Sequence, residues 1–330
     1  MTLRTIVTLA VAASLAPAPF ALPDEGGPPP SASELTPWEW SAKDLRAIEK
    51  REKKAREQDG VHEVRAGGWI VRAAVDARFA AEVSLFMERL EGVFEEVFPY
   101  RATVSIEPTV VVFGSKAEFE RRFPHGERGY FHYGWSGKKY NEFHVYTYVD
   151  HSAQREFARF PYPVLQHEGA HALLRRVYGQ NDIPMWYDEA VGAWFQAYDL
   201  SKPLRENREY SRYGRSEYFA PLRRLLGKYG EQPPPLSRLT DLDRDTWNTD
   251  GFGERTKQNY GLAETLGDYL LSHPEGRAVL DDLHEGVRRG KGREALSEKD
   301  LRRLEPAWQG HVQEVLYFMR DVGESGTRSG

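Results

Sequence analysis

Residues 161–198 of this 330-residue chain read PYPVLQHEGAHALLRRVYGQNDIPMWYDEAVGAWFQAY, and this stretch decides the fold around it. Apolar residues recur at helical spacing on both sides of Gly179, a residue type that often ends helices, and a proline stands near the start of each half. The pattern predicts two helices, over 163–178 and 184–198. Because only a short loop separates them, we expect the second helix to run antiparallel beside the first.

The first predicted helix carries His167-Glu168-Gly169-Ala170-His171. Side chains four residues apart share one face of a helix, so the two imidazoles can bind the same metal ion. Glu168 leans toward the coordination position that a water molecule or a substrate carbonyl takes. A catalytic zinc ion keeps three protein ligands and one open position, so a third ligand is needed. Leu174 and Val177 stand where a metzincin has Gly and His, which excludes that class.

The second predicted helix offers the carboxylates of Asp188 and Glu189. The two helices together resemble those of the gluzincin zinc peptidases, especially the peptidase MA-like family, whose second helix reads close to P-x-W-x-x-E-G-x-A-x-x-F. The matching residues are Pro184, Trp186, Glu189 and Phe195, and Gly192 keeps a small residue where the helices approach. The resemblance implies that His167, His171 and Glu189 bind Zn²⁺, with Asp188 as the alternative third ligand.

The same resemblance implies the reaction. It implies that zinc-activated water hydrolyses a peptide bond, with Glu168 as the general base. Two residues depart from the family pattern: Ala190 replaces a Gly, and Ala193 replaces an acidic residue that often accepts a hydrogen bond from a ligand histidine. Because a zinc-bound histidine usually donates from its other nitrogen, Asp188, Asp199 or a backbone carbonyl has to accept instead.

Residues 259–270 resemble the Tyr-started helix that follows the zinc-binding helices in this family. The resemblance implies that Tyr260 stabilises the oxyanion; the alternative is a packing role, since the chain has 17 tyrosines. His144 and His151 are candidates for contacting substrate, with surface or capping roles as the alternative. His273 precedes a proline at a helix junction and is expected to be structural.

Strands and helices alternate before the helix pair, and helices dominate after it. We expect an α+β fold, a small mixed sheet with helices followed by a mainly helical zincin-like catalytic region. Strands are predicted over 69–71, 104–113 and 143–149, and a loop over 126–140. One helix is capped by Asp76 and ended by Pro99, and another is opened by Ser115 and Glu118. Later helices are predicted over 218–228, 259–272 and 297–322. Aromatic residues of that loop are candidates for shaping a substrate cleft: Tyr130, Phe131, Tyr133 and Trp135. The strand over 143–149 is expected to pair with an extended peptide.

The N-terminus has the features of an export signal. Arg4, an apolar run over 6–15 and Ala16-Pro17-Ala18 match its three parts, and an uncleaved anchoring segment is the alternative. A Pro- and Gly-rich linker and a charged helix over 41–58 follow, and the charges of that helix are interpreted as a solvated face. The expected division is 1–18 signal peptide, 19–60 linker and charged helix, 61–150 N-terminal α/β part of the catalytic domain, 151–200 zinc-site helix pair, and 201–330 helical C-terminal part.

Composition narrows the possible functions. The chain has no cysteine, which excludes disulfides and thiolate ligands, and its formal net charge of -5 with intermixed signs argues against nucleic acid as a partner. We expect an exported protein, periplasmic, extracellular or at the cell surface, with a peptide or protein substrate and no membrane span beyond the signal segment. The alternatives are an exported non-catalytic binding module that retains a zincin-like fold, and a zinc hydrolase of a non-peptide amide.

Overall fold

The protein is seen as a computed structural model that describes residues 40–124, 128–136, 139–149, 161–200, 216–228, 232–248 and 252–326. The strands are β1 (Arg56–Gln58), β2 (Val61–Ala66), β3 (Trp69–Ala73), β4 (Thr109–Phe113), β5 (Gly129–Ser136) and β6 (Lys139–Tyr148). The helices are α2 (Ala42–Glu52), α3 (Ala77–Val97), α4 (Lys116–Arg122), α6 (Tyr162–Tyr178), α7 (Met185–Ala197), α9 (Phe219–Lys228), α10 (Ser237–Thr240), α11 (Arg244–Trp247), α12 (Glu254–Ser272), α13 (Pro274–Arg288) and α14 (Glu298–Gly326), with a short 3-10 turn over Gly292–Glu294. The predicted signal peptide, most of the predicted linker and His151 lie outside the described residues.

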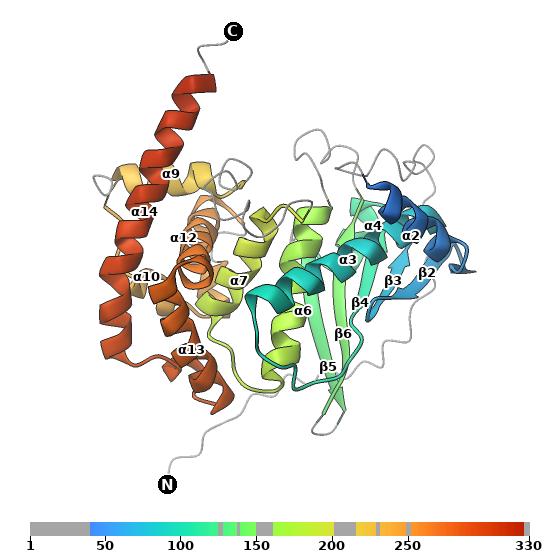
Figure 1. Ribbon diagram of the computed structural model, residues 1–330, viewed down its shortest axis with the longest axis horizontal. Helices are drawn as coiled ribbons and strands as arrows, with labels where there is room; N and C mark the ends of the chain where they lie inside the picture. The colour runs from blue at the N-terminus through green and yellow to red at the C-terminus, as the bar shows by residue number, and fades with distance from the viewer. Residues whose placement is uncertain are drawn as a thin grey trace.

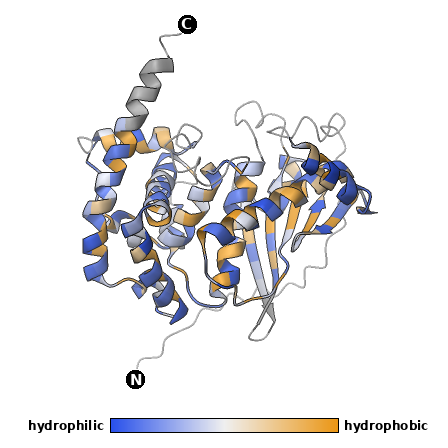
Figure 2. Cartoon of the chain, in the orientation of Figure 1, coloured by the Kyte–Doolittle hydropathy of each residue, from blue (hydrophilic) through white to orange (hydrophobic). Residues whose placement is uncertain are grey.

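The described strands form one mixed sheet in the order β1-β2-β3-β4-β6-β5. β3, β4 and β6 run parallel, whereas the outer neighbours pair antiparallel. β4 is buried on both faces, as expected of a central parallel strand: Val110 and Val112 enter the main core, and Val111 and Phe113 pack toward α4. Figure 2 shows the hydrophobic residues concentrated on the strands and on the helix faces that meet them.

The elements follow one another across the molecule as sheet, α6, α7, α12 and α14 (Figure 1). α3 packs on β2 and β3, with α2 against α3, whereas α4 packs on β4 and β6. α6 packs on β5 and β6, and the helices that follow α7 in the chain build outward from it. The predicted α+β fold class is therefore confirmed, with a mixed sheet followed by a mainly helical region. None of the described helices is both long enough and apolar enough to cross a bilayer.

Most predicted elements before the helix pair are present, with shifted ends. Asp76 caps α3 by accepting a hydrogen bond from the Phe79 backbone N–H, as predicted. The predicted strand over 104–113 is shorter, because β4 begins only after Pro108, and α12 begins five residues before the predicted helix over 259–272. α13, which Pro274 opens, is missing from the predicted elements.

The predicted loop over 126–140 was wrong, because this segment forms β5 and the start of β6. Its glycines suggested a loop, but they serve close packing in a strand. A Cβ atom on Gly129 would lie 2.3 Å from Val164 Cγ1, and one on Gly134 would lie 2.4 Å from Glu142 Oε1. Glycine is required at position 129 because the buried Val164 side chain lies against the backbone there, whereas the neighbour of Gly134 is the exposed end of the flexible Glu142 side chain.

The prediction that the strand over 143–149 pairs with an extended peptide was also wrong. That strand, β6, lies between β4 and β5, so both of its edges are already hydrogen-bonded. β5 is the outer strand on this side of the described sheet. An added peptide strand therefore has to pair with β5, which lies beside α6.

The predicted charged helix over 41–58 ends as α2 at Glu52, and residues 56–58 form β1 instead. One face of α2 is not solvated, because Ile48 is fully buried and the Arg51 guanidinium donates to Ser84 Oγ of α3 over 2.9 Å. The helix is thereby held mainly against α3.

A glycine turn and a pair of side-chain hydrogen bonds hold α6 and α7 in position. Gly179 ends α6 at a φ of 61°, the left-handed region that glycine tolerates, and begins the turn over 179–184. The Gln166 side-chain amide then donates to the backbone oxygens of Phe195, at 2.8 Å, and Tyr198, at 2.7 Å. Gln166 precedes His167, so these buried bonds tie the histidine-bearing helix to the C-terminal end of α7.

We predict that Gln166→Leu lowers the free energy of unfolding by about 2 kcal/mol or more, because two carbonyl oxygens at the end of α7 lose their buried donor. Urea denaturation followed by circular dichroism measures this change. Gln313→Leu, at an exposed position, is the matched control and should change stability little. Equal unfolding midpoints for the two variants would contradict the proposed tie between the helices.

Candidate metal centre

The structure brings His167, His171 and Glu189 together between α6 and α7. One ligand atom from each residue lies within 4.8 Å of the other two, and all three side chains are buried. His167 Nε2 lies 3.2 Å from Glu189 Oε2, and His171 Nε2 lies 3.8 Å from the same oxygen. The antiparallel helix pair predicted from the sequence thus produces this convergence.

The donor set fits a zinc ion. Two imidazole nitrogens and one carboxylate oxygen are typical catalytic zinc ligands, and a tetrahedral site with bonds of about 2.1 Å puts ligand atoms about 3.4 Å apart. The two measured separations, 3.2 and 3.8 Å, bracket that value. A divalent cation bound between these atoms would also compensate the charge of the buried Glu189 carboxylate.

Asp188 lies on the other side of the His171 ring. Its Oδ1 atom is 2.7 Å from His171 Nδ1, so the carboxylate accepts a hydrogen bond there and leaves Nε2 facing Glu189. Asp188 therefore fills the acceptor role that Ala193 cannot fill, rather than the position of a direct ligand. Burial lowers the pKa of His171, but the charge and hydrogen bond of Asp188 outweigh it and, with Glu189, raise this pKa to about 9.

His167 has a different environment. Its Nδ1 atom is buried and has no hydrogen-bond partner among the described residues. The ring lies directly against Gly192 of α7: a Cβ atom at that position would be 2.9 Å from His167 Nε2 and Cε1. The small residue noticed in the sequence is thus the residue that makes room for the His167 imidazole.

Glu168 borders the same space. A Cβ atom on Gly129 of β5 would lie 2.9 Å from its Cγ and 3.2 Å from its Oε1, so the outer strand passes close to this carboxylate. Burial raises the pKa of Glu168 above its ordinary value, the two histidines oppose the rise, and Glu189 and Asp188 add to it. A carboxylate with a raised pKa is a better proton acceptor near neutral pH.

Tyr260 of α12 reaches the site, as the resemblance implied. Its ring centroid is 5.7 Å from that of His167, and the rings of Tyr218, Trp247 and Phe252 surround it at 5.0, 5.6 and 5.8 Å. Burial raises the pKa of the Tyr260 hydroxyl well above its ordinary value, and Glu189 adds to the rise. The hydroxyl therefore keeps its proton and is a potential hydrogen-bond donor.

A small cavity of about 70 Å³ lies between His167, Glu168 and Tyr260. Its wall includes four residues that the sequence analysis did not single out: Arg128, Gln196, Glu217 and Tyr218. Arg128 pairs with Glu217 at 2.7 Å, Glu217 also accepts from Gln196 at 3.2 Å, and Tyr218 donates to Gln196 at 3.1 Å. These residues come from separate segments, and no local sequence pattern marks them.

The remaining candidates lie elsewhere or contribute less. His144 contacts Glu142 at 3.2 Å on β6, and His273 stacks on Tyr269 and lies against His311 between helices, which fits its expected structural role. Of the aromatic residues in β5, Phe131 lies 6.5 Å from the His171 ring, centroid to centroid. Tyr133 instead lies under the Arg175 guanidinium, and Tyr130 packs against Phe123.

No protein-family model, curated protein or solved structure matches this chain. The function proposed below therefore rests on the geometry of the site.

We predict that Asp188→Asn weakens zinc binding by about 10- to 100-fold, because an amide supports the charged metal complex of His171 less well than a carboxylate. Competition with a chromophoric chelator measures the affinity. Asp182→Asn, at an exposed position in the preceding turn, is the control and should leave the affinity unchanged. Equal affinities for both variants would show that Asp188 does not support the metal.

Proposed function

We propose that this protein is a zinc-dependent peptidase of the gluzincin type. The observation that carries the proposal is the convergence of two imidazole Nε2 atoms and the Glu189 carboxylate beside Glu168. Zinc, when bound by His167, His171 and Glu189, supplies a Lewis acid that polarises the scissile carbonyl and increases the acidity of water.

Glu168 has the chemistry of a general base in this proposal. Its raised pKa favours proton uptake near neutral pH, and its carboxylate borders the cavity shared with Tyr260. Glu168 accepts the proton of the attacking water and passes it to the leaving amine, which avoids expulsion of an amide anion. Tyr260, which keeps its proton, donates a hydrogen bond to the substrate oxygen as negative charge develops there.

The outer strand β5 suggests how a peptide is oriented. An extended peptide that adds to β5 gains backbone hydrogen bonds and passes Gly129, whose missing side chain leaves the strand close to Glu168. This arrangement replaces the role predicted for the strand over 143–149. Export, which follows only from the N-terminal sequence, stays part of the proposal.

The alternative of a non-catalytic binding module rested on Ala193, which removes an acidic partner from the ligand histidines. The contact of Asp188 with His171 supplies such a partner from another position, so the presence of Ala193 does not argue against turnover. Glu168 beside the ligands also favours catalysis, because binding of a metal alone requires no base there.

We predict that Glu168→Gln lowers turnover of a peptide library by about 10²- to 10⁴-fold, because an amide cannot accept the proton. Bound zinc, measured by inductively coupled plasma mass spectrometry, should stay at the parental ratio. Glu120→Gln, at a half-buried position of α4 that pairs with Lys116 at 3.6 Å, should retain full activity. Equal cleavage by the parent and Glu168→Gln, or no cleavage by the zinc-loaded parent, would contradict the proposal.

Tyr260→Phe should reduce kcat by about 10- to 1,000-fold while KM changes little, because the lost hydrogen bond forms chiefly in the transition state. Steady-state kinetics on a cleaved peptide separates the two constants. Tyr218→Phe, which keeps the neighbouring ring, is the comparison. If Tyr260→Phe and the parent have the same kcat, Tyr260 only packs.

A further inference from the structure

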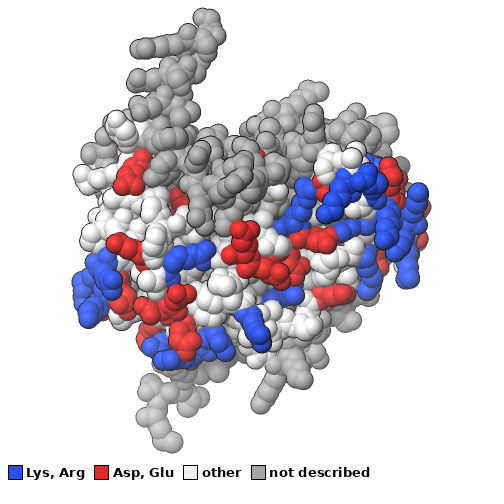
Figure 3. Space-filling view, in the orientation of Figure 1, with Lys and Arg blue, Asp and Glu red and all other residues white. Residues whose placement is uncertain are grey.

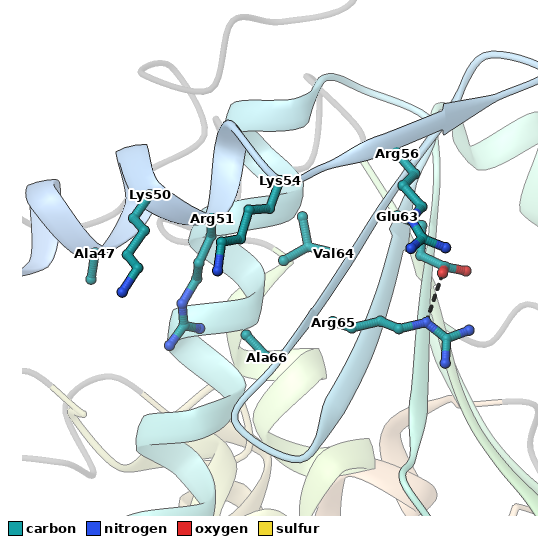
Figure 4. A pocket seen from close by; sticks show the side chains of 9 residues that line it. All are labelled: Ala47, Lys50, Arg51, Lys54, Arg56, Glu63, Val64, Arg65 and Ala66. Carbon is teal, nitrogen blue, oxygen red and sulfur yellow. Dashed lines mark hydrogen bonds and ion pairs between the residues drawn. The ribbon is translucent and has the colours of Figure 1, made fainter.

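Basic side chains gather on α2 and on the β1–β2 hairpin, but they do not converge on one point. Figure 3 shows Lys and Arg over this end of the molecule, with acidic side chains among them. Arg56 lies opposite Glu63 in the register of the two strands, and Glu63 lies on the other face of the sheet from Val64 and α2 (Figure 4). The cations are therefore divided between two faces of the sheet.

A different feature, the Trp247 indole, lies buried beside the candidate metal centre. Trp247 ends α11 and is fully buried, and its Nε1 atom has no hydrogen-bond partner of regular geometry among the described residues. Two other fully buried tryptophans have one. Trp69 Nε1 donates to Glu91 at 2.7 Å, and Trp308 Nε1 donates to Thr265 at 3.1 Å. Because a buried indole N–H usually finds an acceptor, the Trp247 N–H is expected to have one nearby.

The neighbour of this indole is Tyr260. The two ring centroids are 5.6 Å apart at an interplanar angle of 79°, so the rings meet edge to face. Burial is the largest influence on the pKa of the Tyr260 hydroxyl and raises it, whereas hydrogen bonding from the Trp247 side chain lowers it. The indole N–H thus lies close to the hydroxyl oxygen. Catalytic hydrogen bonds are often poorly aligned in ligand-free structures and tighten in the substrate complex.

Two backbone contacts fix Trp247 relative to Tyr260. The Trp247 carbonyl oxygen accepts hydrogen bonds from Asn259 Nδ2 at 3.3 Å and from Thr256 Oγ1 at 3.4 Å. Both donors are buried side chains of α12, and Asn259 directly precedes Tyr260. The indole and the phenol ring are therefore held on one rigid part of the fold.

The opposite face of the Tyr260 ring leaves its hydroxyl available. Tyr218 stacks on this face, with a centroid distance of 5.0 Å and an interplanar angle of 19°. The Tyr218 hydroxyl donates to Gln196 at 3.1 Å, so it does not compete for the Tyr260 oxygen. Tyr260 itself lines the cavity that contains Glu168. Its hydroxyl can therefore accept from the indole side and donate toward the cavity.

We propose that Trp247 is a positioning residue: its indole N–H donates to the Tyr260 hydroxyl oxygen and orients the hydroxyl proton toward the cavity. This role rests on the peptidase function proposed above, in which Tyr260 stabilises the oxyanion. A hydroxyl that accepts one hydrogen bond becomes a stronger donor in the next, because the two bonds polarise each other. The gain is largest in the transition state, where charge develops on the substrate oxygen.

The kinetic test is a double-mutant cycle of Trp247→Phe and Tyr260→Phe on a cleaved peptide. Trp247→Phe should lower kcat by about 3- to 10-fold with little change in KM, because one neutral hydrogen bond is lost. In the Tyr260→Phe background the same change should leave kcat as it is, since the acceptor is already absent. Trp308→Phe removes a buried indole N–H that is bonded to α12 elsewhere, and it should leave kcat unchanged.

A second replacement keeps the size of the ring. Benzothienylalanine in place of Trp247 has sulfur where the indole has its N–H, in a bicyclic ring of nearly the same shape. It should lower kcat as much as Trp247→Phe does, and parental kcat would show that the N–H is not used. Thermal unfolding of each protein checks that the fold is intact.

Nuclear magnetic resonance tests the bond without any cleavage. The chain has eight tryptophans, so the indole N–H signal that Trp247→Phe removes identifies Trp247 among them. In Tyr260→Phe this signal should move upfield, because the N–H loses its oxygen acceptor while an aromatic ring stays beside it. The Trp308 signal, whose acceptor is Thr265, should stay in place.

An unmoved Trp247 signal in Tyr260→Phe overturns the proposal. So does an equal loss of kcat on Trp247→Phe in the parent and in the Tyr260→Phe background, because such a loss reflects packing alone. The two proposals fail in different ways. A zinc-loaded parent that cleaves no peptide contradicts the peptidase function, whereas an unmoved signal in an active enzyme contradicts only the role of Trp247.

Discussion

The close approach of α6 and α7 sets the geometry on which the candidate metal centre depends. Gly192 leaves room for the His167 ring, and Gln166 bonds the start of the motif to the C-terminal end of α7. Because of this contact, Glu189 faces two imidazoles while Asp188, one residue earlier, faces the outer nitrogen of His171. Adjacent carboxylates on one helix thus take different positions, one beside the Nε2 atoms of both imidazoles and one beside the Nδ1 atom of His171.

The rest of the fold supports this helix pair from both sides. The sheet packs against α6 and brings its outer strand β5 past Glu168, while α12 packs against α7 and carries Tyr260 to the cavity. Glycines permit the contacts: a Cβ atom on Gly267 would lie 2.3 Å from the Ala190 backbone oxygen, and one on Gly129 would meet Val164. Residues far apart in the chain therefore share a small, mostly buried site.

The parts of the structure that the sequence predicted are those that depend on local spacing. Histidines four residues apart share a helix face wherever the helix lies, and a cap such as Asp76 is fixed by its own neighbours. The misassigned segment over 126–140 shows the limit, because its Gly129 packs against the Val164 side chain of α6, which only the tertiary fold brings near. Arg128, Gln196 and Glu217 were missed for the same reason: their ion pair and hydrogen bonds join separate segments. The acceptor for His171 was one of three sequence candidates, and the helix geometry selected Asp188.

The central claim is that three side chains of one helix pair bind a single zinc ion. A crystal structure of the zinc-loaded protein, with anomalous data at the zinc absorption edge, tests it most directly. The account predicts one strong anomalous peak within about 2.0–2.2 Å of His167 Nε2, His171 Nε2 and a Glu189 oxygen. No peak there, or a Glu189 carboxylate turned away from both imidazoles, would contradict it.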